Sequence, residues 1–285
     1  MKLGVSTYSL HQAYQSGEMS LEEVIAFIAE AGGDHVEIVP IGYNLVEQPE
    51  LITTIKNAAA ASGLEISNYA IGANFADLSD ADYRAEIERV KQEVDAAAAL
   101  GVKRMRHDVA SSPDLSITNF MNQLPKLAAA CQEIADHAMQ YDITTSVENH
   151  GFFIQHSDRV KALVAATNRD NFKTTLDVGN FLCDDELPTA AVQNNIDIAS
   201  MVHIKDFLYR PKQRIPGAGW FNTANGNWLR GTIAGHGDID MIEVLRIIKA
   251  SGYDGYFSLE FEGMENCREA TKIGLANVRR IWDSV

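Results

Sequence analysis

The chain has 285 residues, 46% of them hydrophobic, and a formal net charge of −15 at pH 7. This length suits one large barrel or two ordinary domains, and the apolar fraction is sufficient for a sizeable core. The acidic balance argues against a nucleic-acid partner, because binding to phosphate backbones requires clustered Lys and Arg. We therefore expect a small-molecule partner.

The three cysteines, Cys131, Cys183 and Cys267, are far apart and form no Cys-x-x-Cys pair. This spacing predicts neither a disulfide framework nor a structural zinc site, and it fits a reducing, cytoplasmic location. The first residues, MKLGVSTYSL, enter a strand-like run without the pattern of a signal peptide. No window approaches 18 consecutive apolar residues, which predicts that the protein does not cross a membrane.

Short apolar runs alternate with longer helical patterns along the whole chain. The predicted strands are Leu3–Ser6, His35–Val39, Leu64–Asn68, Arg104–Asp108, Thr144–Glu148, Phe172–Asp177, Met201–Lys205 and Tyr256–Glu260. The predicted helices lie near 20–32, 50–62, 80–100, 117–140, 158–167, 185–198, 239–251 and 264–282. The fourth helix is typical, because its apolar residues recur at spacings of three and four.

The boundaries of these elements carry their own signals. Ser20 stands three positions before Glu23, which is the spacing of a capping box. Gly63, Gly101 and Gly252 each follow a helix and precede a strand, as C-terminal glycine caps do. Eight strand–helix units predict a parallel sheet that closes into a single (β/α)₈ TIM barrel spanning residues 1–285. An open doubly wound sheet is the competing fold, but no Gly-x-Gly-x-x-Gly follows the first strand.

One connection is much longer than the others. Residues 206–237 separate the seventh strand from its helix, where a few residues would suffice. Loops of this length in compact domains are usually functional or disordered. Because the segment contains Trp220, Phe221 and Trp228, we interpret it as a lid or an interface element.

Four ionisable residues end four consecutive predicted strands: Glu148, Asp177, His203 and Glu260. Side chains alternate along a strand, and in each case the apolar neighbour suits the helix layer, so all four should point into the barrel. Active sites of TIM barrels form at this end of the strands. Three carboxylates and one imidazole favour one divalent ion such as Mn²⁺, Mg²⁺, Co²⁺ or Zn²⁺.

Five segments extend this pattern over most of the chain: SVENHG (146–151), TTLDVGNF (174–181), VHIKD (202–206), GHGDID (235–240) and SLEFEG (258–263). Together they resemble the xylose isomerase-like barrel superfamily, which includes ketose 3-epimerases, hydroxypyruvate isomerases, and inosose dehydratases and isomerases. The resemblance implies that Glu148, Asp177, His203 and Glu260 hold the metal and that Glu148 and Glu260 transfer protons.

The resemblance also implies a reaction class. A metal that bridges a carbonyl and an adjacent hydroxyl stabilises an enediolate, while a carboxylate removes the proton. The expected function is therefore a metal-dependent isomerase or epimerase that acts on a sugar, cyclitol or keto-acid. A dehydratase of the inosose or 3-dehydroshikimate type is the first alternative, and a catalytically retired barrel that binds a sugar or a partner protein is the second. Relatives are often dimers or tetramers, so a homodimer or homotetramer is expected.

Two departures from the family pattern leave the substrate open. Asn180 stands where many relatives have a metal-site His, and His236 replaces a Glu that is usual in the relatives. These changes also argue against a trinuclear zinc nuclease.

Four residues are candidates for substrate binding: Lys205, Asn180, Arg210 and His107. Pairing with Glu262 is the alternative for Lys205, and a solvated position in the loop is the alternative for Arg210. For the inward-facing Glu37, a role at the site and a buried ion pair are equally open.

Overall fold

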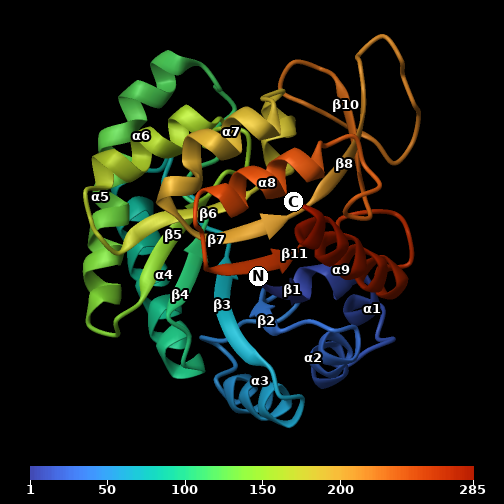
Figure 1. Ribbon diagram of the computed structural model, residues 1–285. Coiled ribbons are helices and arrows are strands. Elements are labelled where there is room, and N and C mark those ends of the chain that lie inside the picture. The colour runs from blue at the N-terminus through green and yellow to red at the C-terminus, as the bar shows by residue number, and fades with distance from the viewer.

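The computed structural model describes all residues, 1–285, and eight parallel strands form a closed barrel in it (Figure 1). The order around the barrel is β1-β11-β7-β6-β5-β4-β3-β2, with parallel pairing throughout. The barrel strands are β1 (Lys2–Ser6), β2 (His35–Ile38), β3 (Glu65–Ile71), β4 (Arg104–His107), β5 (Thr144–Glu148), β6 (Phe172–Asp177), β7 (Ala199–Ile204) and β11 (Tyr256–Leu259). The prediction of a single (β/α)₈ barrel is confirmed, and all eight predicted strands are present.

Helices alternate with the strands and form the outer layer. They are α2 (Leu21–Glu30), α3 (Glu50–Ala61), α4 (Asp80–Leu100), α5 (Ile117–Met139), α6 (Ser157–Thr167), α7 (Pro188–Asn195), α8 (Met241–Ala250) and α9 (Cys267–Ser284), with the short α1 (His11–Gln15) and the 3₁₀ turns η1 (Thr7–Leu10), η2 (Asn180–Asp184) and η3 (Ile196–Ile198). Ser20 and Glu23 form the predicted capping box of α2, and Gly101 ends α4 in the left-handed conformation. None of the helices is both long and apolar enough to cross a lipid bilayer.

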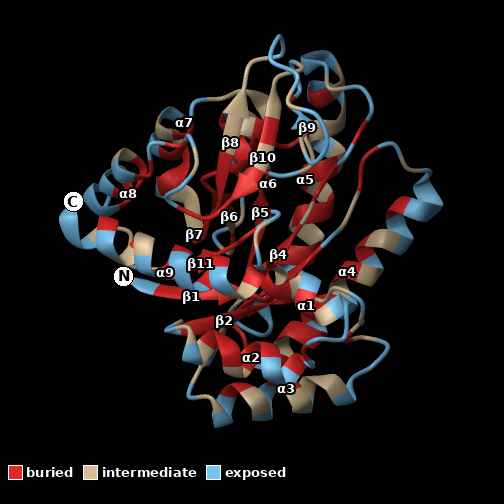
Figure 2. Ribbon diagram, turned by 90° about the vertical axis from the view of Figure 1, so that its right-hand side faces the viewer, coloured by how far each residue is buried: buried red, intermediate tan, exposed pale blue.

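One continuous core joins the barrel strands to the helices. Buried residues occupy the strands and the helix faces turned toward them, while exposed residues lie on the outside (Figure 2). At the N-terminal end of the strands the barrel interior is filled by His35, whose Nε2 lies 3.0 Å from the carbonyl oxygen of Phe257. Gly4 is required there, because a Cβ atom at this position would lie 2.2 Å from the His35 backbone oxygen.

The segment after β7 has a structure that the sequence did not predict. It forms a separate three-stranded antiparallel sheet of β8 (Asp206–Arg210), β9 (Phe221–Asn222) and β10 (Trp228–Thr232). In Figure 1, β8 and β10 stand apart from the barrel strands. The buried Asp206 carboxylate ties the two ends of this segment together, because it accepts hydrogen bonds from the backbone N–H groups of Gly235 and Gly237.

Candidate metal centre at the C-terminal end of the barrel

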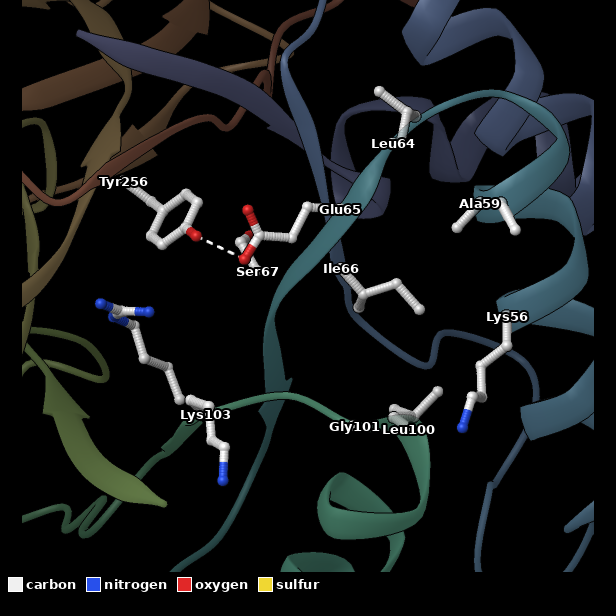
Figure 3. A pocket seen from close by; sticks show the side chains of 12 residues that line it. Lys56, Ala59, Leu64, Glu65, Ile66, Ser67, Leu100, Gly101, Lys103 and Tyr256 are labelled. Carbon is white, nitrogen blue, oxygen red and sulfur yellow. Dashed lines mark hydrogen bonds between the residues drawn. The ribbon is translucent and has the colours of Figure 1, made fainter. Parts of the chain in front are cut away.

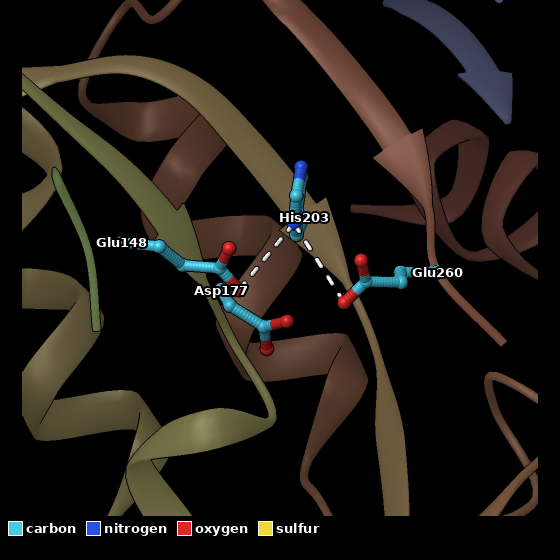
Figure 4. Close-up of side chains that lie close together, drawn as sticks. All are labelled: Glu148, Asp177, His203 and Glu260. Atoms are coloured by element: carbon cyan, nitrogen blue, oxygen red, sulfur yellow. Dashed lines mark ion pairs between the residues drawn. The ribbon is translucent and has the colours of Figure 1, made fainter. Parts of the chain in front are cut away.

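The structure brings the four predicted strand-end residues together. Their strands are adjacent in the order β11-β7-β6-β5, and Asp177 lies opposite His203 in the register of β6 and β7. One ligand atom from each of Glu148, Asp177, His203 and Glu260 lies within 4.8 Å of the others. The carboxylates of Glu148 and Glu260 approach the His203 ring from two sides, at 3.6 and 3.8 Å from Nδ1 (Figure 4). We call these four residues the quartet.

Burial makes the charges of the quartet expensive unless they are paired. All four side chains are buried, three of them at 1% exposure or less. Isolated charges are poorly tolerated in such an environment and are normally paired or bound to metal. The site must therefore contain compensating cations, and the structure shows which ones they are.

Glu37 on β2 balances the positive charge of the His203 imidazole, and it does so at the ring nitrogen that points away from the quartet. Its Oε1 lies 2.9 Å from Nε2 of His203 and also accepts a hydrogen bond from the Asn68 amide at 2.7 Å. With Nε2 engaged, Nδ1 of His203 faces the carboxylates of the quartet. Burial alone would lower the pKa of His203, but Glu37, Glu260 and Glu148 together raise it well above its ordinary value. Of the two interpretations left open for Glu37, the buried ion pair is present, and its partner belongs to the quartet.

Asp177 is positioned by backbone groups. Its Oδ1 accepts hydrogen bonds from the N–H groups of Gly179 at 2.7 Å and Asn180 at 2.9 Å, so Oδ2 turns toward the quartet. Burial raises its pKa to about 6, with Glu148 and Glu260 acting in the same direction against Lys205. Gly179 also allows the chain to pass Lys205 closely, since a Cβ atom there would lie 2.9 Å from the Lys205 carbonyl oxygen.

Lys205 lies at the centre of the site. Its Nζ is 2.7 Å from Glu260 Oε2, 3.2 Å from Glu262 Oε2 and 3.4 Å from Asp177 Oδ2. Burial alone would lower its pKa, but these carboxylates raise it well above its ordinary value, so the amine is charged. The pairing with Glu262 that the sequence offered as an alternative to substrate binding is present, and Lys205 pairs with Glu260 as well. A role in substrate binding stays a prediction.

Asn180 connects Glu148 of the quartet with Lys205. Its side-chain N–H donates to Glu148 Oε1 at 3.0 Å, and its side-chain oxygen accepts from Lys205 Nζ at 3.3 Å. The amide therefore stands within the site, although it can neither carry charge nor shuttle protons.

Arg106 on β4 is the cation that the sequence analysis missed. Its Nη2 lies 2.5 Å from Glu148 Oε2, and its Nη1 donates to the carbonyl oxygen of Ile71. Burial would raise the pKa of Glu148, but Arg106 and then His203 hold it well below its ordinary value. Glu148 is thus an ionised carboxylate. The alternation of β4 contains the signal that identifies Arg106, because this residue shares the inward side with its register partner Ser146.

His107 is not brought to the quartet. It follows Arg106 on the strand and therefore faces the helix layer, where its ring lies 6.1 Å from the rings of both Phe75 and Phe172. Its Nδ1 lies 2.9 Å from the Asp108 carbonyl oxygen, and burial lowers its pKa to about 4. The structure thus corrects the expectation that His107 lines the pocket: this ring is a neutral core residue.

Arg210 also lies away from the quartet. It is on β8 of the separate sheet, where its guanidinium contacts Asp238 at 3.1 Å and lies over the Trp220 ring at 5.6 Å. The side chain is 40% exposed. Of the two interpretations for this residue, the structure shows a partly solvated arginine with partners of its own.

A cavity lies at the opposite, N-terminal end of the strands. It has a volume of about 560 Å³ and is lined by Lys56, Lys103, Arg104, Glu65 and Tyr256 among others (Figure 3). Each of the three cations donates to a backbone carbonyl oxygen. Lys56 donates to Ala99, Lys103 to Tyr141 and Arg104 to Ser200. Cations at helix C-termini are stabilised by the exposed carbonyl groups and the helix dipole, and two of these acceptors lie at or just beyond such ends. The basic character of this cavity therefore has a structural explanation.

Comparisons with known proteins agree with this architecture. Residues 25–281 match the model of the family described as "Xylose isomerase-like TIM barrel", and the chain belongs to this family. A comparison with curated proteins finds no match.

Solved structures share the fold at low sequence identity. The chain superimposes on the IOLI protein with a binding zinc atom with a TM-score of 0.78, 17% identity and coverage of 100% of this chain and 99% of that one. The probable 3-DHS dehydratase AsbF from Bacillus anthracis superimposes with a TM-score of 0.76 and 18% identity, with coverage of 98% of this chain and 99% of that one. A D-tagatose 3-epimerase-like protein superimposes with a TM-score of 0.74 and 22% identity, with coverage of 100% of this chain and 99% of that one. Another match is longer: the chain spans 42% of a xylose isomerase-like TIM barrel/4-hydroxyphenylpyruvate dioxygenase fusion protein. These similarities establish the fold.

Proposed function

We propose that the protein is a divalent-metal-dependent enzyme that isomerises or epimerises a sugar or polyol-ketone through an enediolate. The observation that carries the proposal is the quartet itself, whose four ligand atoms converge within 4.8 Å at the end of the barrel where TIM-barrel enzymes have their active sites. The D-tagatose 3-epimerase-like and zinc-bound IOLI structures that share the fold support the same class.

The donor set fits a divalent ion. Nδ1 of His203 and Oδ2 of Asp177 are buried and make no hydrogen bond, although carboxylates and Lys205 lie near them. Buried polar atoms without partners are rare in folded proteins and often belong to sites that bind something. Three carboxylate ligands and one imidazole suit Mn²⁺, Mg²⁺, Co²⁺ or Zn²⁺ rather than a soft, thiolate-preferring ion. Glu37 would hold the imidazole in place, as carboxylates behind metal-binding histidines do.

When bound, the ion would supply Lewis-acid polarisation of a substrate carbonyl. The residues of the chain would move the proton. Glu148 is kept ionised by Arg106, which suits removal of a proton from the carbon next to the carbonyl. Glu260 approaches from the other side of His203, and Lys205 lies 2.7 Å from its carboxylate, so this pair can return a proton on the opposite face.

Two buried cations would compensate the charge that develops on the substrate. An enediolate carries more negative charge than the ketone from which it forms. Lys205 and Arg106 are fixed beside Glu260 and Glu148 before any substrate arrives. Preorganised positive groups of this kind stabilise the charge of a transition state because they need not reorganise during the reaction.

A dehydratase is the second candidate, because the first step would be the same. Lys205 is the observation that favours it: a charged amine at the centre of the site could donate the proton that a departing β-hydroxyl group needs. The shared fold with the probable 3-DHS dehydratase AsbF is compatible with this reaction.

One experiment separates these functions. The protein is loaded with Mg²⁺, Mn²⁺, Co²⁺ or Zn²⁺ and incubated in D₂O with a panel of ketohexoses, ketopentoses and keto-inositols, and the products are followed by mass spectrometry. An isomerase or epimerase adds one mass unit to the recovered sugar, whereas a dehydratase produces a compound lighter by one water. Absence of both changes with every metal and substrate would favour the retired, sugar- or partner-binding barrel. Asp238→Asn serves as the control variant, since it removes a carboxylate that pairs with Arg210 away from the quartet.

A further inference from the structure

A second, smaller cavity adjoins the quartet on the side of the three-stranded sheet. Its volume is about 180 Å³, and Phe152, Phe207 and Phe221 supply aromatic surface to its lining. Asn180 and Glu262 line it as well. Both of these residues touch the proposed catalytic groups, because Asn180 donates to Glu148 and Glu262 contacts Lys205. The cavity is therefore adjacent to the site, and the side chains of Asn180 and Glu262 lie between the two.

The backbone at Phe152 is strained. Its φ is 65°, a left-handed conformation that bulky residues rarely adopt. The buried Gln155 holds it there, with its side-chain oxygen accepting from the Phe152 N–H at 2.6 Å and its amide donating to the Asn180 carbonyl oxygen at 2.5 Å. Such strain persists only where the surroundings enforce it, and it is concentrated at ligand-binding sites. A glycine would satisfy this turn without strain, so the aromatic ring itself is the feature that needs explanation.

The lining defines the chemistry of an occupant. No Lys or Arg side chain lines the cavity, and its one basic residue, His150, is paired with Asp108 at 3.2 Å. An anionic group such as a phosphate would find no free cation here and would face Glu262. Aromatic rings offer flat apolar surface, while Asn180 and Glu262 can bond hydroxyl groups at the inner edge. A cavity of about 150 Å³ accommodates benzene, so this space suits one six-membered ring.

The cavity is not simply the interior of the small sheet. Cys183 and Phe207 form a small apolar cluster with Leu229, against which Phe152 packs, and this cluster supplies the apolar side of the cavity. Phe221 is 36% exposed, and the inner wall of the cavity is polar rather than apolar. A core would bury Phe221 fully and would not place a buried amide at its edge.

We propose that this cavity is a substrate subsite that binds an uncharged, ring-sized group attached to the hydroxy-carbonyl unit held at the quartet. The inference rests on the proposed function, because it adds the second half of the substrate to the half that would react. In this proposal Phe152 and Phe221 contact the ring of the substrate and select for it, and the three-stranded sheet forms one wall of the subsite.

The test compares two neutral ketones, hydroxyacetone and 2-hydroxyacetophenone, which carry the same hydroxy-carbonyl unit without and with a six-membered ring. Their dissociation constants are measured on the Co²⁺-loaded protein from the visible absorption of cobalt. We expect 2-hydroxyacetophenone to bind at least about tenfold more tightly, as a buried aromatic contact implies. Phe152→Gly and Phe221→Ala should each remove most of this preference without weakening hydroxyacetone. Glycine accepts the φ of residue 152, so the first variant loses the ring without backbone strain.

Trp220→Ala is the matched control, because Trp220 precedes Phe221 but stacks with Arg210 and Arg230 instead of lining the cavity. Equal affinity for the two ketones in the wild type, or an unchanged ratio in both variants, would overturn the subsite. If neither ketone alters the cobalt spectrum, the proposed function fails, and saturation-transfer NMR then decides the subsite alone. Saturation transfer from the protein to the phenyl ring of 2-hydroxyacetophenone that disappears in Phe152→Gly would still support the subsite. Absence of this transfer in the wild type would refute the subsite.

Discussion

The two ends of the barrel hold their charges in different environments, largely exposed at the N-terminal end and buried at the C-terminal end. At the N-terminal end, Lys56, Lys103 and Arg104 each donate to a backbone carbonyl, and Glu65 accepts from the Tyr256 hydroxyl. At the C-terminal end, carboxylates face one another, and Nδ1 of His203 and Oδ2 of Asp177 have no hydrogen-bond partner. The larger cavity is at the first end, but the converging cluster of buried ionisable groups is at the second.

The difference teaches that cavity volume and surface charge are weaker guides to function than a cluster of buried ionisable groups that are incompletely paired. Charges that cap helix ends stabilise the fold, and this role is sufficient to explain their presence. Charges that burial penalises without full pairing are retained for another reason, and binding and catalysis are common ones. Four changes test this contrast, from the largest expected effect to the smallest.

Removal of a proton-transfer carboxylate should have the largest effect. Glu148→Gln and Glu260→Gln are each expected to lower kcat by roughly 10²–10⁴-fold, the usual contribution of a positioned general base or acid. Steady-state kinetics on the substrate identified by deuterium incorporation would measure this loss, with Asp238→Asn as the carboxylate control. Retention of more than a tenth of wild-type kcat in both quartet variants, with metal bound, would contradict the proposed roles.

His107 should respond to pH as a core residue. Its pKa is lowered to about 4, so between this value and the ordinary 6.5 the unfolded chain binds a proton that the folded protein does not. Stability is therefore present above about pH 6.5 and is lost as the pH falls toward 4, by up to about 3 kcal/mol.

Urea unfolding at pH 7.5 and pH 4.5 of the wild type and of His107→Phe measures this contribution by difference. Between pH 7.5 and pH 4.5, the free energy of unfolding should fall less in His107→Phe than in the wild type. The affinity of the variant for the metal should equal that of the wild type. An equal acid response in both proteins would show that His107 does not remain neutral in the core.

Glu37 should affect the affinity of the site for the metal. Glu37→Gln removes the charge behind His203 while preserving shape, and we expect the affinity for Co²⁺ or Zn²⁺ to fall by about 10–100-fold, as for other carboxylates that orient metal-binding histidines. Isothermal titration calorimetry provides the affinity. Glu93→Gln is the matched control, because Glu93 is another buried carboxylate, bonded to Tyr69. Equal losses in the two variants would mean that the effect is structural.

The smallest effect is expected at the N-terminal end. Lys103→Met should lower the free energy of unfolding by at most about 1 kcal/mol, since this side chain is 60% exposed and its interaction with carbonyl groups is screened. Catalysis and metal affinity should not change. A loss of activity comparable to that of the quartet variants would break the contrast between the two ends.

Local sequence was sufficient to predict the barrel and the end of it at which the quartet lies. Helix and strand periods differ, and eight alternations of these periods allowed few folds. The inward direction of Glu148, Asp177, His203 and Glu260 followed from alternation with an apolar neighbour, which is a property of each strand by itself.

The remaining features of the site depend on tertiary structure. In strand β4 the apolar Met105 shares a face with His107, so alternation already indicates that His107 points outward and Arg106 inward. The register with β5 then decides that Arg106 meets Glu148. Glu37 and His203 are 166 residues apart and meet because the barrel closes. The sequence of the segment 206–237 revealed its aromatic content but not its sheet. This sheet depends on pairing between residues that are distant in the sequence and therefore leaves no local periodic pattern. Alternation along each strand thus determined which residues face inward, while barrel closure and register decided which charges meet.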